Sequence, residues 1–475
     1  MAAFFSVGEQ KVRPGVYFNY ENFGTPPIAG AADGVCAAVF RSNWGPIGSA
    51  VLLELDDFNA ITRQFGSNGT TDVPFEMFRG GARSVYATRL GSGGTKGTYS
   101  IKSSTGTTLI NLVLRYPGSR QFQIVIRQTL EDDQMKELLL VEDTTILQTM
   151  QFAKDTTDEV APLLAAYAVS GSNWFTLDQV GTAKGALAIV DQVPITPGTD
   201  PTINTAAYST AFEALEPYRW NVIGLDTNDP AAQALMQAFL SRLFLCGKFV
   251  MGVVGDPTTI PFATRLARAK AFNDYRIVYV ASGWKDSSGA VYAGYLAAAR
   301  IAGMIAGTPS KESITHLPIT GAVELTESLT NSQYIQTINS GMLVFSVSSL
   351  GNIWVESAVN TLTSISNSSK DDTGWKKIKR VKVRFELMQR INDTVEPLVG
   401  RVNNDPDGRA NVLQTAQGVL NIMMAENKIL SGAKVIMDSK NPPKGDSAWF
   451  LVYADDIDAM EKMYFTFKFR FAPEE

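Results

Sequence analysis

The sequence predicts a multidomain protein of mixed α/β and α+β class, and three observations lead to this prediction. Residues 204–345 alternate strand-like and helix-like segments, which is typical of an α/β layer with a largely parallel sheet. Residues 92–203 contain short strand patterns about 10–14 residues apart, which favours a small β-sandwich or barrel. Residues 346–475 combine long helices with strands and indicate an α+β region.

Length and composition limit the class of protein. A chain of 475 residues is long enough for about three or four domains, and 45% apolar residues can fill sizeable cores. The net charge of −5 gives no general case for nucleic-acid binding. The first residues lack the basic region of a signal peptide, and no apolar run of about 18 residues occurs, so we expect a cytoplasmic protein without membrane insertion.

Catalytic and metal chemistry have little support. His316 is the single histidine and lies in a proline-containing, loop-like stretch, which excludes multi-histidine metal sites and favours a structural or surface role. Cys36 and Cys246 fit no metal or redox spacing, and we expect both to be small apolar core residues. No phosphate loop or nucleophile elbow occurs, so no catalytic, cofactor-binding or metal-binding residue is predicted.

The N-terminal part predicts an arm followed by core elements. Residues 1–23 contain Pro14 and Gly15, which disfavour a helix, and then Val16, Phe18 and Tyr20 at alternate positions, which is typical of a strand. The following segments VCAAVFRSNWGPIG, DDFNAITRQFG and GGARSVYATRL predict a buried strand, a short helix and a strand.

The middle of the chain predicts the β-rich and α/β parts. TYSIKSS, TTLINLVLRY, FQIVIRQ and KELLLVE are predicted strands, and DEVAPLLAAYAVS is a predicted helix. Further on, Asp229 and Pro230 open a helix that carries Leu235, Phe239 and Leu243 on one stripe. A helix rich in alanine and glycine ends at Gly307, and its small residues permit close backbone packing.

The last region predicts several elements in order. WVESAVNTLTS is strand-like, KKIKRVKVRFELMQRI passes from strand into helix, and a long helix ends near Gly432. AWFLVYAD predicts a strand, and DDIDAMEKM predicts a short helix with an acidic start.

The final strand pattern, MYFTFKFRF, is the clearest in the chain. Phe465, Phe467, Phe469 and Phe471 share one face, with polar residues and Tyr464 on the other. An aromatic edge left open invites pairing with another chain. The strand is therefore either docked inside its own domain or donated to a neighbour.

One basic run also stands out in the ten residues from Trp375 to Arg384. Three explanations of this run are open: a strand edge that faces solvent, a surface that binds an acidic protein partner and, less favoured, a nucleic-acid site. Its six basic residues are Lys376, Lys377, Lys379, Arg380, Lys382 and Arg384.

Several motifs, taken in order, resemble those of contractile tail sheath proteins of phages, prophages and phage-tail-like bacteriocins. RPGVYFN, AAVFRSNWGPIG and GGARSVYATRL resemble the start of that family. AGYLAAARIAGMIAGTPSKESITHLPITGA, GMLVFS and WVESAVNTLTS are similar to its central segments, and VGRVNNDPDGRANVLQTAQGVLN and DDIDAMEKMYFTFKFRF to its C-terminal ones. The chain departs from the family's usual pattern at Ala358 and Val359, and we expect Asn360 and Thr361 to keep a structural role.

The resemblance implies a domain plan. Residues 24–91 and 204–345 would form a core that is subtilisin-like in shape only, and residues 92–203 a variable insertion domain on the outside of the tail. Residues 346–475 would form the assembly domain. Residues 1–23 and 463–475 would be arms that exchange strands with neighbouring subunits.

The resemblance also implies a function without catalysis or cofactors. Six-subunit rings would stack into a helical homo-oligomer around an inner tail tube, contact baseplate and tail terminator proteins, and contract to drive the tube through a target envelope. Assembly would take place in the bacterial cytoplasm, and the basic run would contact the tube. The alternatives are a hydrolase-like enzyme on the α/β core and another tail or capsid assembly protein.

Overall fold

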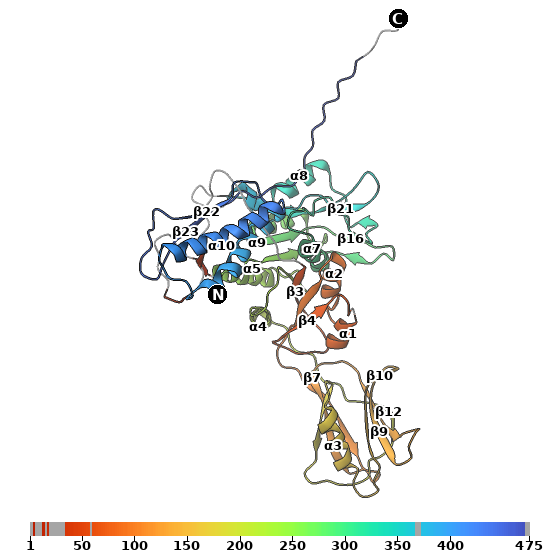
Figure 1. Ribbon diagram of the computed structural model, residues 1–475. Coiled ribbons are helices and arrows are strands. Elements are labelled where there is room, and N and C mark those ends of the chain that lie inside the picture. Colours follow the sequence, from red (N-terminus) through yellow and green to blue (C-terminus); the bar gives the residue numbers. More distant parts are fainter. Residues whose placement is uncertain are drawn as a thin grey trace. The chain divides into compact units, whose positions relative to one another are not determined.

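The protein has a mixed α/β fold built from several sheets (Figure 1). The computed structural model describes residues 3–4, 12–14, 17–18, 34–57, 59–365 and 372–470. Two compact units make up the chain. Unit 1 contains Met1–Cys36, Glu76–Ser84 and Arg219–Glu475, and unit 2 contains Ala37–Phe75 and Val85–Tyr218. The predicted β-rich segment lies within unit 2, and the division into assembly regions stays a prediction.

Four parallel strands in unit 1 confirm the predicted α/β alternation. They lie in the order β19, β15, β14, β13, and all their residues are buried, as expected for a parallel sheet with both faces covered. The strands are β13 (Val222–Leu225), β14 (Met251–Gly255), β15 (Ile277–Val280) and β19 (Met342–Leu343). The helices between them are α5 (Pro230–Leu245), α6 (Phe262–Phe272), α7 (Tyr295–Gly307) and α8 (Asn331–Asn339).

Two of these helices begin and pack as their sequences predict. The Asp229 side chain caps α5 by accepting a hydrogen bond from the Ala231 amide at 3.2 Å, and Pro230 lies in the first turn. In α7, a Cβ atom added at Gly303 would lie 2.0 Å from the carbonyl oxygen of Met77. Only glycine permits that approach, so the predicted close backbone packing of this helix is confirmed.

Short antiparallel sheets complete the strands of unit 1. They are β16 (Trp284–Lys285) with β17 (Val291–Tyr292) and β18 (Glu324–Leu325), β20 (Phe345–Val347) with β21 (Ile353–Val355), and β22 (Lys434–Met437) with β23 (Phe450–Tyr453). The β23 prediction is confirmed, whereas β22 has no predicted counterpart.

The basic run lies on a helix, so the prediction of a strand there is wrong. The short 3-10 turn η1 (Thr373–Lys376) leads into α9 (Ile378–Val395), η2 (Glu396–Leu398) follows, and α10 (Pro406–Ala425) ends before the predicted stop near Gly432. Val381, Val383 and Phe385 alternate like strand residues, but Ile378, Val381 and Phe385 also have helical spacing and are all buried. Helices α9 and α10 share an apolar cluster that stabilises the helical choice.

Three smaller predictions are also wrong. The segment DDIDAMEKM is not helical, since its carboxylates bind groups on separate parts of the fold. The strand around Trp354 ends at Val355. Cys246 is exposed because it follows the last turn of α5, while Cys36 is buried and burial raises the pKa of its thiol.

Asn360 and Thr361 have the structural role that was expected of them. Both are buried, and the Asn360 side chain donates to the Trp375 carbonyl at 2.6 Å. The Thr361 hydroxyl donates to the Asp274 carbonyl at 2.8 Å and accepts from the Asp274 amide at 3.1 Å. The pair joins the end of α6 to the start of α9.

Unit 2 contains the β-rich segment as two antiparallel sheets. One has the order β10, β9, β8, β12 and the other β11, β7, β6. Their strands are β6 (Lys96–Lys102), β7 (Thr108–Pro117), β8 (Gln123–Gln128), β9 (Met135–Glu142), β10 (Thr145–Ala153), β11 (Phe175–Gln179) and β12 (Val190–Pro194). Unit 2 also holds β4 (Ala50–Glu54), α1 (Ala60–Phe65), α3 (Val160–Ser170) and α4 (Thr205–Leu215), with most of β3 (Val35–Phe40), β5 (Ser84–Arg89) and part of α2 (Asp72–Gly80).

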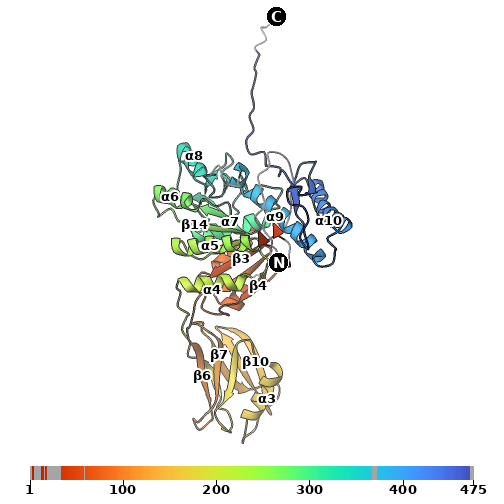
Figure 2. The same ribbon diagram turned by 90° about the vertical axis from the view of Figure 1, so that its left-hand side faces the viewer.

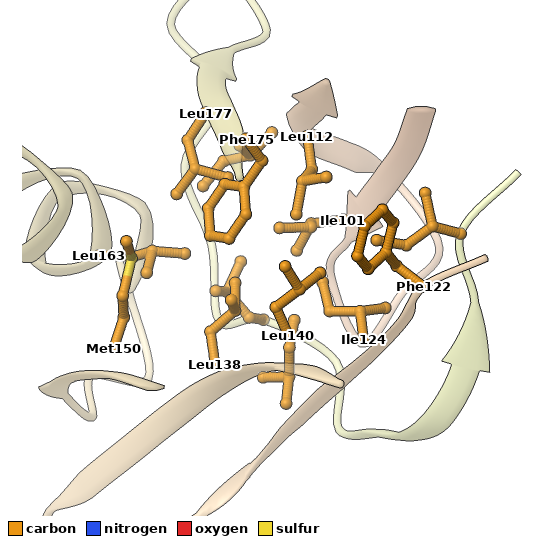
Figure 3. Close-up of a cluster of buried hydrophobic side chains, with 14 of the residues drawn as sticks. Ile101, Leu112, Phe122, Ile124, Leu138, Leu140, Met150, Leu163, Phe175 and Leu177 are labelled. Atoms are coloured by element: carbon orange, nitrogen blue, oxygen red, sulfur yellow. The ribbon is translucent and has the colours of Figure 1, made fainter. Parts of the chain in front are cut away.

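One apolar cluster joins the two sheets (Figure 3). Ile101 and Leu112 come from the three-stranded sheet, Leu138 and Leu140 come from the four-stranded sheet, and Leu163 of α3 lies beside them. All five are buried, so the sheets face each other across a shared core, as the alternating strand patterns predicted.

We expect replacement of Leu140 by alanine to destabilise this core by about 2–5 kcal/mol, since the methyl groups are lost and a cavity remains. Hydrogen exchange of the slowest β8 and β9 amides measures the change. Ile146→Ala is the control, since Ile146 is 55% exposed. Equal effects of the two substitutions would contradict a shared buried core.

Candidate assembly arm and its root

Residues 463–470 leave the body of unit 1 as an extended segment (Figures 1 and 2). Phe465, Phe467 and Phe469 are 76%, 77% and 93% exposed. Within the described part of the chain, no hydrogen bond joins this segment to another element. Docking inside its own domain is therefore wrong for these residues, and donation to a neighbour stays a prediction. Phe471 lies outside the described residues.

The aromatic side chains keep the predicted alternation. The rings of Phe467 and Phe469 stack with centroids 6.2 Å apart, as residues two apart on one face of an extended chain do. Lys468 between them is exposed. The segment thus has strand-like geometry, although no strand is assigned, because a strand needs a hydrogen-bonded partner.

The N-terminal arm is described only in part. Strand β1 (Ala3–Phe4) pairs in parallel with β2 (Tyr17–Phe18), so Phe18 lies in a strand as predicted. Val16 and Tyr20 lie outside the described residues.

The root of the C-terminal arm, residues 455–462, is held by the basic run. Asp456 is 9% exposed and accepts hydrogen bonds from the guanidinium groups of Arg380 and Arg384, at 3.0 Å from the Nη2 atom of each. Burial raises the pKa of the Asp456 carboxyl, but the Arg380 hydrogen bond and both positive charges outweigh burial and lower it overall. The carboxylate is thus ionised and paired at neutral pH.

Two further carboxylates hold the root. Lys377 Nζ lies 2.8 Å from Asp458 and 3.1 Å from Glu461. Glu461 also accepts hydrogen bonds from the hydroxyl groups of Ser313 at 3.0 Å and Thr315 at 2.9 Å. The root therefore contacts both α9 and the loop before His316.

The rest of the basic run is also engaged inside the subunit. Lys376 donates to the Thr363 carbonyl at 3.0 Å, and Lys382 donates to the carbonyls of Ile305 and Thr308. Lys379 is buried, and that burial lowers its pKa. All six basic side chains are buried or half-buried, so the run is no freely exposed cationic patch.

Sequence reasoning missed the acidic partners of this run. The signal was the cluster Asp456, Asp458 and Glu461 directly before the aromatic strand, which the sequence alone assigned to the start of a helix. Pairing with residues about 75 positions earlier depends on the folded chain.

The single histidine lies against an aromatic ring. The His316 ring stacks on Trp354 with centroids 4.1 Å apart, which confirms a structural surface position. No cluster of histidine, cysteine or carboxylate side chains suited to a metal ion occurs among the described residues. In the same part of the chain, no helix has both the length and the apolar composition needed to cross a membrane.

Comparison with known proteins gives a family model for part of the chain and two relatives over most of its length. Residues 202–361 match the model of the phage tail sheath protein central domain. YqbK of Bacillus subtilis is an uncharacterised protein that is 24% identical, with 97% of this chain and 98% of YqbK covered. The phage-like element PBSX protein XkdK of the same organism is 22% identical, with the same coverage of both chains.

Solved structures share the fold. The sheath tail protein of Desulfitobacterium hafniense superposes with a TM-score of 0.72 at 21% identity, covering 94% of this chain and 98% of that one. The sheath tail protein of Listeria innocua gives 0.69 at 16% identity, covering 90% and 95%. The contracted helical sheath of the anti-feeding prophage gives 0.53 at 11% identity, covering 97% and 99%. Residues 202–361 therefore match the central domain of phage tail sheath proteins, and the chain has the fold of solved sheath tail proteins.

Proposed function

We propose that the chain is a tail sheath subunit, which polymerises as stacked six-subunit rings around an inner tube and contracts to drive the tube through a target cell envelope. The observation that carries the proposal is the exposed, alternating aromatic segment at residues 463–470. Burying each phenylalanine side chain contributes about 1.5–3 kcal/mol, which the isolated subunit does not gain. A neighbouring subunit that supplies a sheet edge would provide both the burial and the missing backbone hydrogen bonds.

A two-stranded sheet in the same unit is suited to receive such a strand. β22 and β23 pair only with each other among the described residues, so each has one edge without a neighbouring strand there. Ile436 on β22 is 38% exposed. We propose that the arm of a neighbour adds to this sheet and covers the Ile436 side chain, while the N-terminal arm strengthens the same joint.

Contraction would follow from rigid subunits linked by such joints. Buried ion pairs and hydrogen bonds hold the described body of unit 1, as at Arg300, whose Nη2 atom lies 2.7 Å from Glu76. Subunits of this kind can rotate against one another while the exchanged strands keep them connected. The energy would come from new contacts between subunits, without a cofactor or ATP. The solved sheath of the anti-feeding prophage in its contracted state supports this comparison.

The domain plan and the partners are part of the proposal. Residues 92–203 would form the outward insertion, residues 24–91 and 204–345 the core, and residues 346–475 the assembly domain. Inner tube, baseplate and tail terminator proteins would be the partners, and a relative occurs in a solved baseplate. Contact between the basic run and an acidic tube stays a prediction, and its internal pairing leaves little charge to offer.

Deletion of residues 464–475 should abolish polymers while leaving the folded subunit unchanged, because the described arm packs on nothing within it. Deletion of residues 1–20 should do the same. Negative-stain microscopy scores tubes, and thermal unfolding checks the fold. Deletion of residues 472–475 alone keeps the strand pattern and should retain tubes. Normal tubes after either long deletion would contradict strand exchange.

A charge on the proposed acceptor sheet should also block assembly. Ile436→Lys places a cation where a neighbour's apolar arm would pack, yet a half-exposed site changes the stability of the subunit by only about 0.5 kcal/mol. Sedimentation of polymers measures the effect. Ile146→Lys in β10 is the matched control and should assemble normally. Equal assembly of the two variants would show that the sheet of β22 and β23 is not the acceptor.

A further inference from the structure

We propose that the basic face of α9 is an anchor for the C-terminal arm, which fixes where the arm begins and carries the pull that a neighbour exerts on it. This inference rests on the proposed strand exchange. It gives Lys377, Arg380 and Arg384 a role inside the subunit, distinct from the predicted contact with an inner tube.

The anchor has a regular geometry on the helix. Lys377 directly precedes α9, and Arg380 and Arg384 follow it at helical spacing, so the three cations lie along one face. Asp456 accepts from both arginines, and Lys377 pairs with the next carboxylates along the root. Charge complementarity therefore matches two segments that run side by side.

Arg384 is also held by contacts outside the root. Arg384 lies over the Trp375 ring, 4.5 Å from its centroid, and its Nη2 atom is 3.0 Å from Asp372. Trp375 is itself buried. A side chain fixed in this way loses little freedom when it pairs, and a partly buried pair is less screened than a surface pair.

Hydrogen bonds to groups outside the basic run stop at the same place as the ion pairs. The Ile457 amide donates to the Lys428 carbonyl at 3.2 Å, and Glu461 accepts from Ser313 and Thr315. Two residues later Met463 is 62% exposed, and Tyr464 is 90% exposed. The contacts of the chain with the rest of unit 1 therefore end between Glu461 and Met463, which gives the exchanged strand a defined starting point.

Hydrogen exchange of the full-length subunit tests the anchor without a polymer. The Ile457 amide, which donates to the Lys428 carbonyl, should be protected in the parent protein, whereas amides 463–470 should exchange at once. Asp456→Asn should reduce protection of the Ile457 amide by at least about tenfold, since two charge-assisted pairs beside it are weakened. Exchange in β13–β15 should not change, which shows that the variant is folded.

A matched control and a rescue sharpen the test. Asp393 lies on α9 and forms an exposed pair with Arg219, so Asp393→Asn breaks that pair and should leave the root protected. The charge exchange Arg380→Asp with Asp456→Arg should restore part of the protection lost in either single variant. Unchanged protection in Asp456→Asn, or no rescue by the double variant, would overturn the anchor.

Assembly provides the second readout and separates the two proposals. Asp456→Asn should form fewer and shorter tubes than Asp393→Asn, since its arm has no fixed origin. Loss of root protection with fully normal tubes would overturn the role in assembly while leaving strand exchange intact. The arm deletion tests strand exchange separately, because its outcome does not depend on the anchor.

Discussion

Burial of aromatic surface is the constraint on which this subunit depends. A segment with phenylalanines at alternate positions has strand geometry but no sheet of its own, and three of these side chains are largely exposed. Water disfavours such a surface, and an unpaired extended backbone gains no ladder hydrogen bonds. The proposed strand exchange would cover this surface, because a sheet edge of a neighbouring subunit would supply the missing hydrogen bonds.

Ion pairs hold the segment that precedes the aromatic residues. Six basic residues within ten positions suggested a surface for an acidic partner, but the fold supplies the acids from its own chain. Asp456 is the central example, since two arginines one helical turn apart converge on it. A run that stands out in sequence can therefore be internally neutralised, and its function then concerns the geometry of the chain rather than attraction of a partner.

Buried polar contacts elsewhere serve rigidity. The hydrogen bond of Thr361 to Asp274 spans 87 positions, and the pair of Glu76 and Arg300 spans 224. The neighbouring Asn360 side chain bonds to Trp375, 15 positions later. Removing one partner of such a pair leaves a buried group unsatisfied, so these contacts resist local rearrangement. The contraction proposed above would need this property, because each subunit would have to move as a rigid body.

Local periodicity was enough to predict the α/β alternation of residues 204–345, the two-sheet core of unit 2 and the aromatic alternation at the C-terminus. It did not predict β12, whose residues are mostly exposed, or the helical state of α9, whose apolar residues fit both periods. The folded chain was needed to show that Asp456 binds Arg380, that Cys246 is exposed and that the arm begins after Glu461. These features depend on contacts between residues far apart in sequence, which no local pattern encodes.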